Sequence, residues 1–169
     1  AIIASTTDLA LSQQTLSTIP GRSFGGRFGS AIQMIGDLNG DGRADVLVGI
    51  PRDDTNGEDA GAVHVLSGFN GSLIRVHYGS SSGYQSGTSV VAIDDATGDG
   101  IDDYAIGTPY TDAAGSDSGS VRVYSGATGS QISLMNGAAA GDHFGWSLRA
   151  LGNKAQTTIG LQPMLAIGA

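Results

Sequence analysis

The chain has 169 residues, of which 40% are hydrophobic, a formal net charge of −8 and no cysteine. This length suffices for one domain with a sizeable core, and without cysteine neither disulfides nor thiolate metal sites can form. The acidic balance lacks the basic patch that nucleic-acid binding requires, and it disfavours anionic membrane surfaces. No apolar run has the length of a membrane span.

The composition and the apolar runs of the chain predict short β-strands. Glycine is abundant, with 28 residues, whereas helix formers are scarce, since Glu58 and Lys154 are the only residues of their kinds. Apolar runs between glycine-bearing turns therefore predict an all-β protein. The predicted strands of the first unit are Ser30–Ile35, Asp45–Ile50, Ala62–Leu66 and Leu73–Tyr78. The Asp45–Ile50 run is apolar on both faces, as expected of a strand between packed sheets.

The loop between the first two strands has the spacing of a cation site. Oxygen-bearing side chains stand at its positions 1, 3, 5 and 9, and glycine stands at position 6, where a sharp turn needs a positive φ. They are Asp37, Asn39, Asp41 and Asp45, with Arg43 between them offering a backbone carbonyl. Calcium takes about six to eight such oxygens. The same residues are common in tight turns, which is the alternative interpretation.

The pattern returns in a second loop, which favours calcium over a plain turn. Asp95, Thr97, Asp99 and Asp103 repeat the side-chain positions, and Ile101 repeats the carbonyl position. An EF-hand loop would need an acidic residue at its twelfth position. Val48 and Ile106 stand there, inside apolar strands, so a strand–loop–strand calcium site is predicted instead.

The offset from Asp37 to Asp95 is a 58-residue period that extends through the chain and predicts a propeller or solenoid. Gly61-Ala62-Val63-His64-Val65-Leu66-Ser67-Gly68 aligns with Gly119-Ser120-Val121-Arg122-Val123-Tyr124-Ser125-Gly126. Four-stranded units packed face to face are propeller blades. The expected organisation is an N-terminal segment at 1–23, blades at 24–81 and 82–139, and a partial third blade at 140–169.

Several motifs resemble the FG-GAP repeats of the integrin α-subunit propeller and its bacterial relatives. The residues that carry the resemblance are Phe28-Gly29, the loop Asp37–Asp45 and Val48-Gly49-Ile50-Pro51, then Ser86-Gly87, Asp95–Asp103 and Ile106-Gly107-Thr108-Pro109, and finally Phe144-Gly145 and Ile167-Gly168-Ala169. The resemblance covers roughly residues 24–169. It implies that each loop binds Ca²⁺ through the side chains and carbonyls named above.

The three loops differ from one another. Thr97 replaces the usual acid or amide with a hydroxyl, so weaker binding is expected in the second loop. In the third repeat, Asn153-Lys154-Ala155-Gln156-Thr157 has no carboxylate and carries a cation. We expect that loop to be metal-free, which leaves two Ca²⁺ sites per chain.

About three blades do not close a ring, since a propeller needs about four to eight. The chain is predicted to end after the second strand of its last blade, and Thr15–Ile19 is a candidate outermost strand. Two explanations fit: the chain is a fragment of a longer protein, or copies join head to tail and complete one another's blades.

No catalytic constellation is evident, so an enzyme is not expected. His64, His77 and His143 are scattered and are interpreted as surface residues, with His64 pointing outward. Trp146 is expected in the core or between blades. Tyr78, Tyr84 and Tyr110 are candidates for ligand contact.

The resulting hypothesis is a calcium-pinned, non-catalytic scaffold that recognises a protein or glycan partner. Millimolar calcium outside cells would fill its sites, which favours a secreted, extracellular or periplasmic location. One alternative is an accessory propeller of a larger secreted hydrolase or lyase. The other is a self-assembling structural unit.

Overall fold

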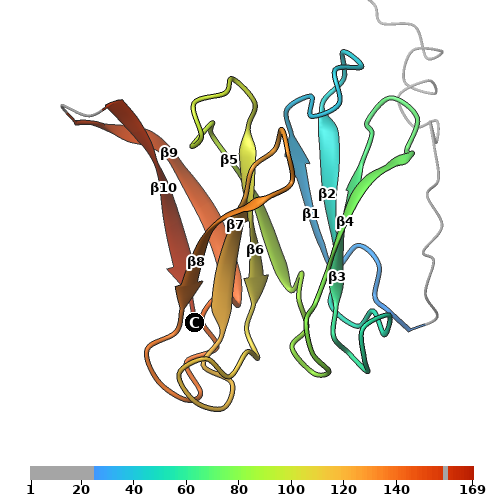
Figure 1. Cartoon of the computed structure of the whole chain (residues 1–169), viewed down its shortest axis with the longest axis vertical. Helices are drawn as coiled ribbons and strands as arrows, with labels where there is room; N and C mark the ends of the chain where they lie inside the picture. The colour runs from blue at the N-terminus through green and yellow to red at the C-terminus, as the bar shows by residue number, and fades with distance from the viewer. Residues whose placement is uncertain (1–24, 158–159) are drawn as a thin grey trace, which may run out of the picture.

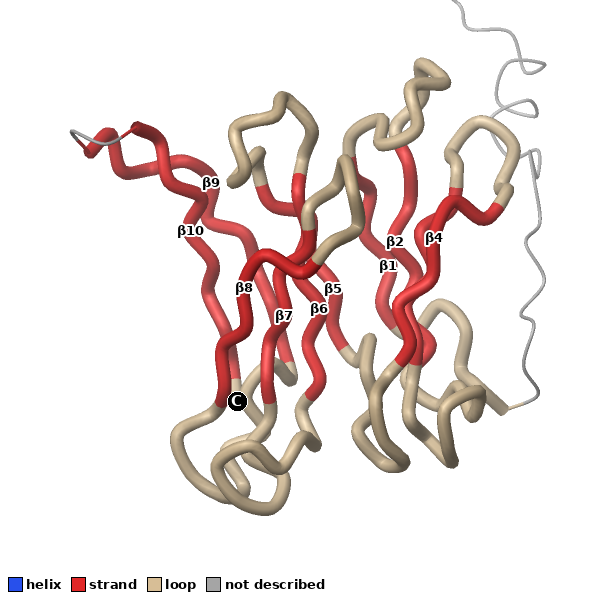
Figure 2. The backbone as a smooth tube through the Cα atoms, viewed as in Figure 1, coloured by secondary structure: helices blue, strands red, loops and turns tan. Residues whose placement is uncertain are grey.

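The computed structural model in Figure 1 describes residues 25–157 and 160–169. All of its regular elements are β-strands, which confirms the all-β prediction (Figure 2). They form two four-stranded antiparallel sheets and one two-stranded sheet that leave a ring unclosed. The predicted N-terminal segment at 1–23 and the candidate strand Thr15–Ile19 lie outside the described residues.

The first sheet contains the four strands predicted for the first repeat. Its strands are β1 (Ala31–Ile35), β2 (Asp45–Ile50), β3 (Ala62–Leu66) and β4 (Leu73–Tyr78). They pair in sequence order, each antiparallel to the next. Only β1 departs from its predicted bounds, by one residue. β2 is buried at five of its six positions, as expected of a strand packed on both faces.

The second sheet repeats the first, one period further along the chain. Its strands are β5 (Ser89–Ile93), β6 (Asp103–Thr108), β7 (Ser120–Tyr124) and β8 (Gln131–Asn136). Even the irregularity is shared, because a register shift lies between Val65 and Leu66 and again between Val123 and Tyr124. The period in the sequence is therefore a period of the fold.

The third sheet is a hairpin of β9 (Ser147–Thr157) and β10 (Gly160–Gly168). The backbone of residues 153–157 continues β9. The third repeat thus has an extended strand where the first two repeats have their acidic loops, and its segment was wrongly predicted to be a loop.

Apolar side chains from facing sheets form the two cores. Leu47, Val63 and Val65 of the first sheet pack with Tyr104 and Ile106 of the second, and all five are at most 1% exposed. The opposite face of the second sheet packs against the hairpin through residues such as Val121 and Leu148. Figure 1 shows the resulting stack of three sheets side by side.

Glycine allows the sheets to approach closely at two equivalent positions. A Cβ on Gly49 would lie 2.1 Å from the carbonyl oxygen of Gly87, and a Cβ on Gly107 would lie 2.1 Å from that of Gly145. Real side chains never come so close to a backbone oxygen. The blade contact therefore requires glycine at the same position of both repeats.

One face of the first sheet is exposed. We call it the open face, and its exposed residues are Ile32 (65%), Met34 (65%) and Phe69 (66%). Val90, which is the counterpart of Ile32 in the second repeat, is only 8% exposed because the first sheet covers it. No described element of the chain covers the open face in the same way.

Two expectations about aromatic residues were wrong. His64 is 6% exposed, since it lies on the inner strand β3 and its ring meets Phe28 edge-on at 6.0 Å. Trp146 is 50% exposed and contacts the rings of Tyr110 and His143 at 6.0 and 6.2 Å. A position in a repeat alignment does not determine burial where the neighbouring blade differs.

Candidate metal centre

The first acidic loop joins β1 to β2 and folds around the carboxylate of Asp37. Its Oδ1 accepts the backbone N–H groups of Asn39, Gly40 and Asp41 at 3.2, 2.7 and 3.1 Å, and its Oδ2 accepts that of Gly42 at 2.7 Å. The bond from Gly42 is the main cause of a lowered pKa of Asp37. The loop thus keeps a charged carboxylate at its first position.

Asp41 connects this loop to the turn between β3 and β4. The hydroxyl of Ser67 donates to its Oδ2 at 2.6 Å, and the N–H of Arg43 donates to its Oδ1 at 2.9 Å. The hydrogen bond from Ser67 is the largest cause of the lowered pKa of Asp41. Ser67 is 3% exposed, so it is a buried support for an exposed ligand candidate.

Asp45 closes the loop from within the protein. It is fully buried, and its Oδ2 and Oδ1 accept the N–H groups of Leu38 at 2.8 Å and Gly68 at 3.1 Å. Among the described residues the loop carboxylates form no salt bridge. A buried carboxylate without a cation is costly.

The three carboxylates of the loop come together. Asp37, Asp41 and Asp45 each offer an oxygen within 4.8 Å of the others. An oxygen-only donor set of three carboxylates suits a hard cation such as Ca²⁺. Gly42 has a φ of 84°, which is the sharp turn expected at the sixth position. The residues present therefore fit a calcium ion.

The second acidic loop has the same framework, with weaker support. Oδ1 of Asp95 accepts the N–H groups of Gly98 at 2.6 Å and Asp99 at 3.1 Å, and its Oδ2 accepts that of Gly100 at 2.7 Å. The bond from Gly100 is the main cause of its lowered pKa. The Thr97 hydroxyl donates to Asp95 Oδ1 at 3.3 Å.

Asp103 closes the second loop as Asp45 closes the first. It is fully buried and accepts the N–H groups of Ala96 at 2.8 Å, Thr97 at 3.0 Å and Gly126 at 2.9 Å. Asp99, however, receives no hydrogen bond from the equivalent hydroxyl of Ser125 within the described structure, and that hydroxyl accepts the N–H of Thr128 at 3.2 Å. No second group of acidic side chains gathers as closely in the described part of the chain.

The remaining predicted ligands occupy different environments. Asn39 and Arg43 are exposed, and the Asn39 side-chain oxygen accepts the N–H of Asp41 at 2.9 Å. Ile101 is half-buried and packs against the core between the first two sheets. Ser67 was not among the predicted site residues, although Ser67-Gly68 recurs as Ser125-Gly126 and that recurrence was the available signal.

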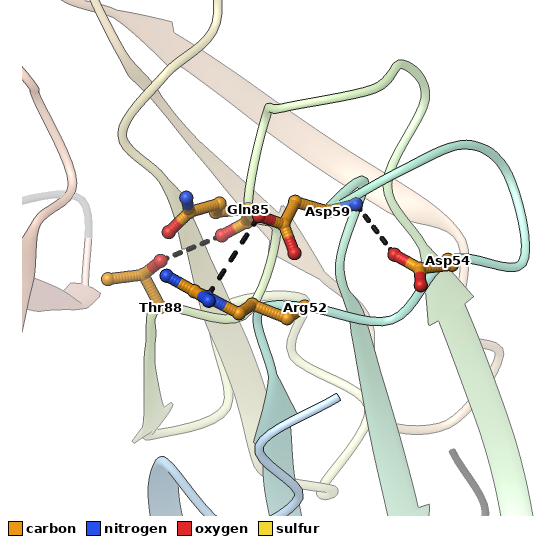
Figure 3. A network of polar contacts seen from close by, with 5 residues as sticks. All are labelled: Arg52, Asp54, Asp59, Gln85 and Thr88. Atoms are coloured by element: carbon orange, nitrogen blue, oxygen red, sulfur yellow. Dashed lines mark hydrogen bonds and ion pairs between the residues drawn. The ribbon is translucent and has the colours of Figure 1, made fainter. Parts of the chain in front are cut away.

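A separate polar network lies at the opposite ends of the strands (Figure 3). Arg52 is 3.9 Å from Asp59, whose N–H donates to Asp54 at 2.7 Å. The N–H of Gln85 donates to the carbonyl of Asp59 at 3.0 Å, and the Thr88 hydroxyl donates to that of Gln85 at 2.8 Å. These bonds join the β2–β3 loop to the β4–β5 loop.

The stacked four-stranded sheets and the recurring acidic loops define a β-propeller-type repeat protein. Residues 28–66 match the family model of the FG-GAP repeat. The chain is 38% identical over 91 residues to integrin alpha-2 of Bos taurus. The aligned region covers 48% of this chain and 7% of that protein. It is 28% identical over 143 residues to integrin alpha-4 of Xenopus laevis, and this aligned region covers 82% of this chain and 14% of that protein. With integrin alpha-3 of Mus musculus the identity is 30% over 171 aligned residues, which cover 92% of this chain and 15% of that protein.

These similarities support the FG-GAP repeat, integrin α-like propeller family for this chain. The chain spans about 7 to 15% of the length of these relatives. No helix in the described residues has the length and apolar character of a membrane span.

Proposed function

We propose that this chain is a calcium-binding, non-catalytic part of an extracellular β-propeller that serves as a recognition or adhesion scaffold. Its blades run from 24 to 81 and from 82 to 139, with a partial blade at 140–169. The calcium ligands are the side chains of Asp37, Asn39, Asp41 and Asp45 with the Arg43 carbonyl, and those of Asp95, Thr97, Asp99 and Asp103 with the Ile101 carbonyl.

The observation that carries this proposal is the grouping of Asp37, Asp41 and Asp45. Three carboxylates within 4.8 Å repel one another unless a cation neutralises them. Backbone N–H groups and the Ser67 hydroxyl favour the charged form of two of these carboxylates, since these hydrogen bonds lower the pKa values of Asp37 and Asp41. An ion there would fasten the β1–β2 loop to the β3–β4 turn, because Asp45 and Asp41 both bond to that turn.

The second site is expected to bind more weakly. Thr97 offers a hydroxyl where the first loop has the amide oxygen of Asn39, and Asp99 lacks the hydrogen bond by which the buried Ser67 hydroxyl orients Asp41. The two ligand sets carry the same three carboxylate charges, so the expected difference comes from the rigidity of the site, which also tunes calcium affinity. The chain therefore has one strong and one weak site.

Calorimetric titration of the chelator-treated protein with CaCl₂ tests the proposal. We expect about two ions per chain with unequal affinities. Asp41→Ala should abolish the tight phase and Asp99→Ala the weak one, whereas Glu58→Ala, an exposed acidic residue outside both loops, should change neither. A titration without binding heat, or loop variants that bind like the parent protein, would contradict the assignment.

The open face favours a second candidate function, that of a self-assembling unit. Ile32, Met34 and Phe69 are about two-thirds exposed, whereas equivalent positions in the second sheet are covered by a blade. A blade from another copy or from a longer chain would bury this surface. Sedimentation at micromolar concentration separates these cases, since a clean monomer contradicts self-assembly.

A further inference from the structure

A pocket of about 350 Å³ with both polar and apolar lining lies beside the outer strands of the second sheet. It lies past the end of β6, whereas the second acidic loop precedes the start of that strand. Two loops and two strands contribute to it, and the residues that matter here are Tyr84, Thr111, Asp112, Ser120, Arg122 and Asn136. None of them belongs to a proposed calcium site.

Two hydroxyl groups of this pocket have no hydrogen-bond partner. Thr111 is 4% exposed and Ser120 is 1% exposed, and the side-chain oxygen of each is buried and unpaired within the described structure. Buried polar groups nearly always find a partner, so unpaired ones point to a water, ion or ligand that belongs there. A hydroxyl turns between staggered positions, which lets it meet a ligand in the pocket.

The pocket also contains a guanidinium group without a counter-ion. Arg122 is half-buried, and among the described residues it forms no hydrogen bond or salt bridge. Leaving a charge half-buried and unpaired is unfavourable. Guanidinium groups match carboxylates in shape and bind them through paired hydrogen bonds. A carboxylate is therefore one anionic group that fits Arg122.

Asp112 restricts which carboxylate fits. It lines the same pocket, is exposed, and accepts the N–H of Asp117 at 3.0 Å with one oxygen. A bare anion would be repelled by Asp112, whereas a ligand that also carries hydroxyl groups can donate to its other oxygen. The ring of Tyr84 adds an amphipathic surface of the kind that packs against a sugar ring.

We propose that this pocket binds an acidic sugar residue, with its carboxylate on Arg122 and its hydroxyl groups on Asp112, Thr111 and Ser120. The proposal rests on the recognition role proposed above and gives it a glycan ligand. The chain's charge of −8 opposes such a ligand at long range. Salt screens that repulsion beyond about 10 Å at 0.1 M, while the direct contact with the guanidinium persists.

Amide NMR titration of the whole chain in calcium buffer tests the proposal, with glucuronate as the probe. We expect saturable shifts at Thr111, Asp112 and Ser120. Glucose lacks the carboxylate and acetate lacks the hydroxyl groups, so each should bind at least about tenfold more weakly. No saturable shift with glucuronate, or equal binding of acetate, would overturn the sugar assignment. Calcium calorimetry on the same sample keeps this outcome distinct from a failure of the calcium proposal.

Variants separate binding from folding. Arg122→Gln should weaken glucuronate by about tenfold or more, and Arg149→Gln, an exposed residue of β9, should leave it unchanged. Ser120→Ala is the sharper test because it removes an unpaired hydroxyl: melting should stay the same or rise, while glucuronate affinity falls. Unchanged affinity in both Arg122→Gln and Ser120→Ala would contradict the proposed contacts.

Discussion

Nε2 of His77 lies 2.7 Å from the hydroxyl oxygen of Tyr104, across the contact between the first two sheets. Arg75 donates to the same oxygen at 3.2 Å, and because burial lowers the pKa of His77, its unprotonated Nε2 can accept the Tyr104 O–H. The His77 ring also packs on Tyr124, with centroids 4.0 Å apart. The outer strand β4 is thus attached to β6 and β7 by a cluster whose burial favours neutral histidine.

Folding stability should fall with acidification because of His77. Its burial, with the charge of Arg75 nearby, lowers its pKa from 6.5 to about 4. Between those values the unfolded chain binds a proton that the folded chain excludes, so this stability is complete above pH 6.5 and is lost toward pH 4. The loss is at most about 3 kcal/mol.

Urea unfolding in chelator at several pH values between 4.5 and 7.5 measures this effect. His77→Gln should flatten the dependence in that window, while Glu58→Ala should keep it. An equally steep dependence without His77 would assign it to another group.

Gly126→Ala should destabilise the protein strongly. A Cβ there would lie 1.9 Å from the carbonyl oxygen of Asp102 and 2.9 Å from Leu38 Cδ2. Since the N–H of Gly126 also supports Asp103, the shift would disturb the second loop. We expect a loss of about 3 kcal/mol in denaturant unfolding.

Gly83→Ala is the control for that variant. Gly83 has a φ of 79° but open space around its Cβ position, so it reports the cost of backbone conformation alone, about 1 kcal/mol. Equal effects at the two positions would contradict the close contact at Gly126.

The core and the open face should respond differently to truncation. Leu47 is fully buried between the first two sheets, so Leu47→Ala should cost about 2–5 kcal/mol. Ile32 is 65% exposed, and Ile32→Ala should change stability by less than about 1 kcal/mol in denaturant unfolding. A large cost at Ile32 would show that another blade covers the open face in solution.

Thr97→Asn should strengthen the weaker calcium site, because it places an amide oxygen at the third loop position, as Asn39 does in the first loop. We expect the weak phase of the calorimetric titration to shift to lower calcium concentration while the tight phase stays. Thr55→Asn, at an exposed position outside both loops, is the control. A weak phase that does not move would remove position 97 from the ligand set.

The sequence by itself determined the strands and their repetition. Glycine-bearing turns and alternating apolar residues are local signals, and each repeat shows them again. The bounds of β2, β3 and β4 were therefore predicted correctly. The acidic loops were equally readable, because each short loop contains every proposed ligand of its site. These features depend on neighbours in the chain, which the sequence displays directly.

Only the tertiary structure decided which groups meet across the repeats. It set the burial of His64 and the exposure of Trp146. It also brought together residues from separate strands or loops, namely Ser67 with Asp41 and His77 with Tyr104. The unpaired Arg122, Thr111 and Ser120 became visible only once their surroundings were placed. Burial and hydrogen bonding depend on the packing between sheets. The repeat period specifies the position of a residue within its own blade, but it does not specify which residues of the neighbouring blade contact it.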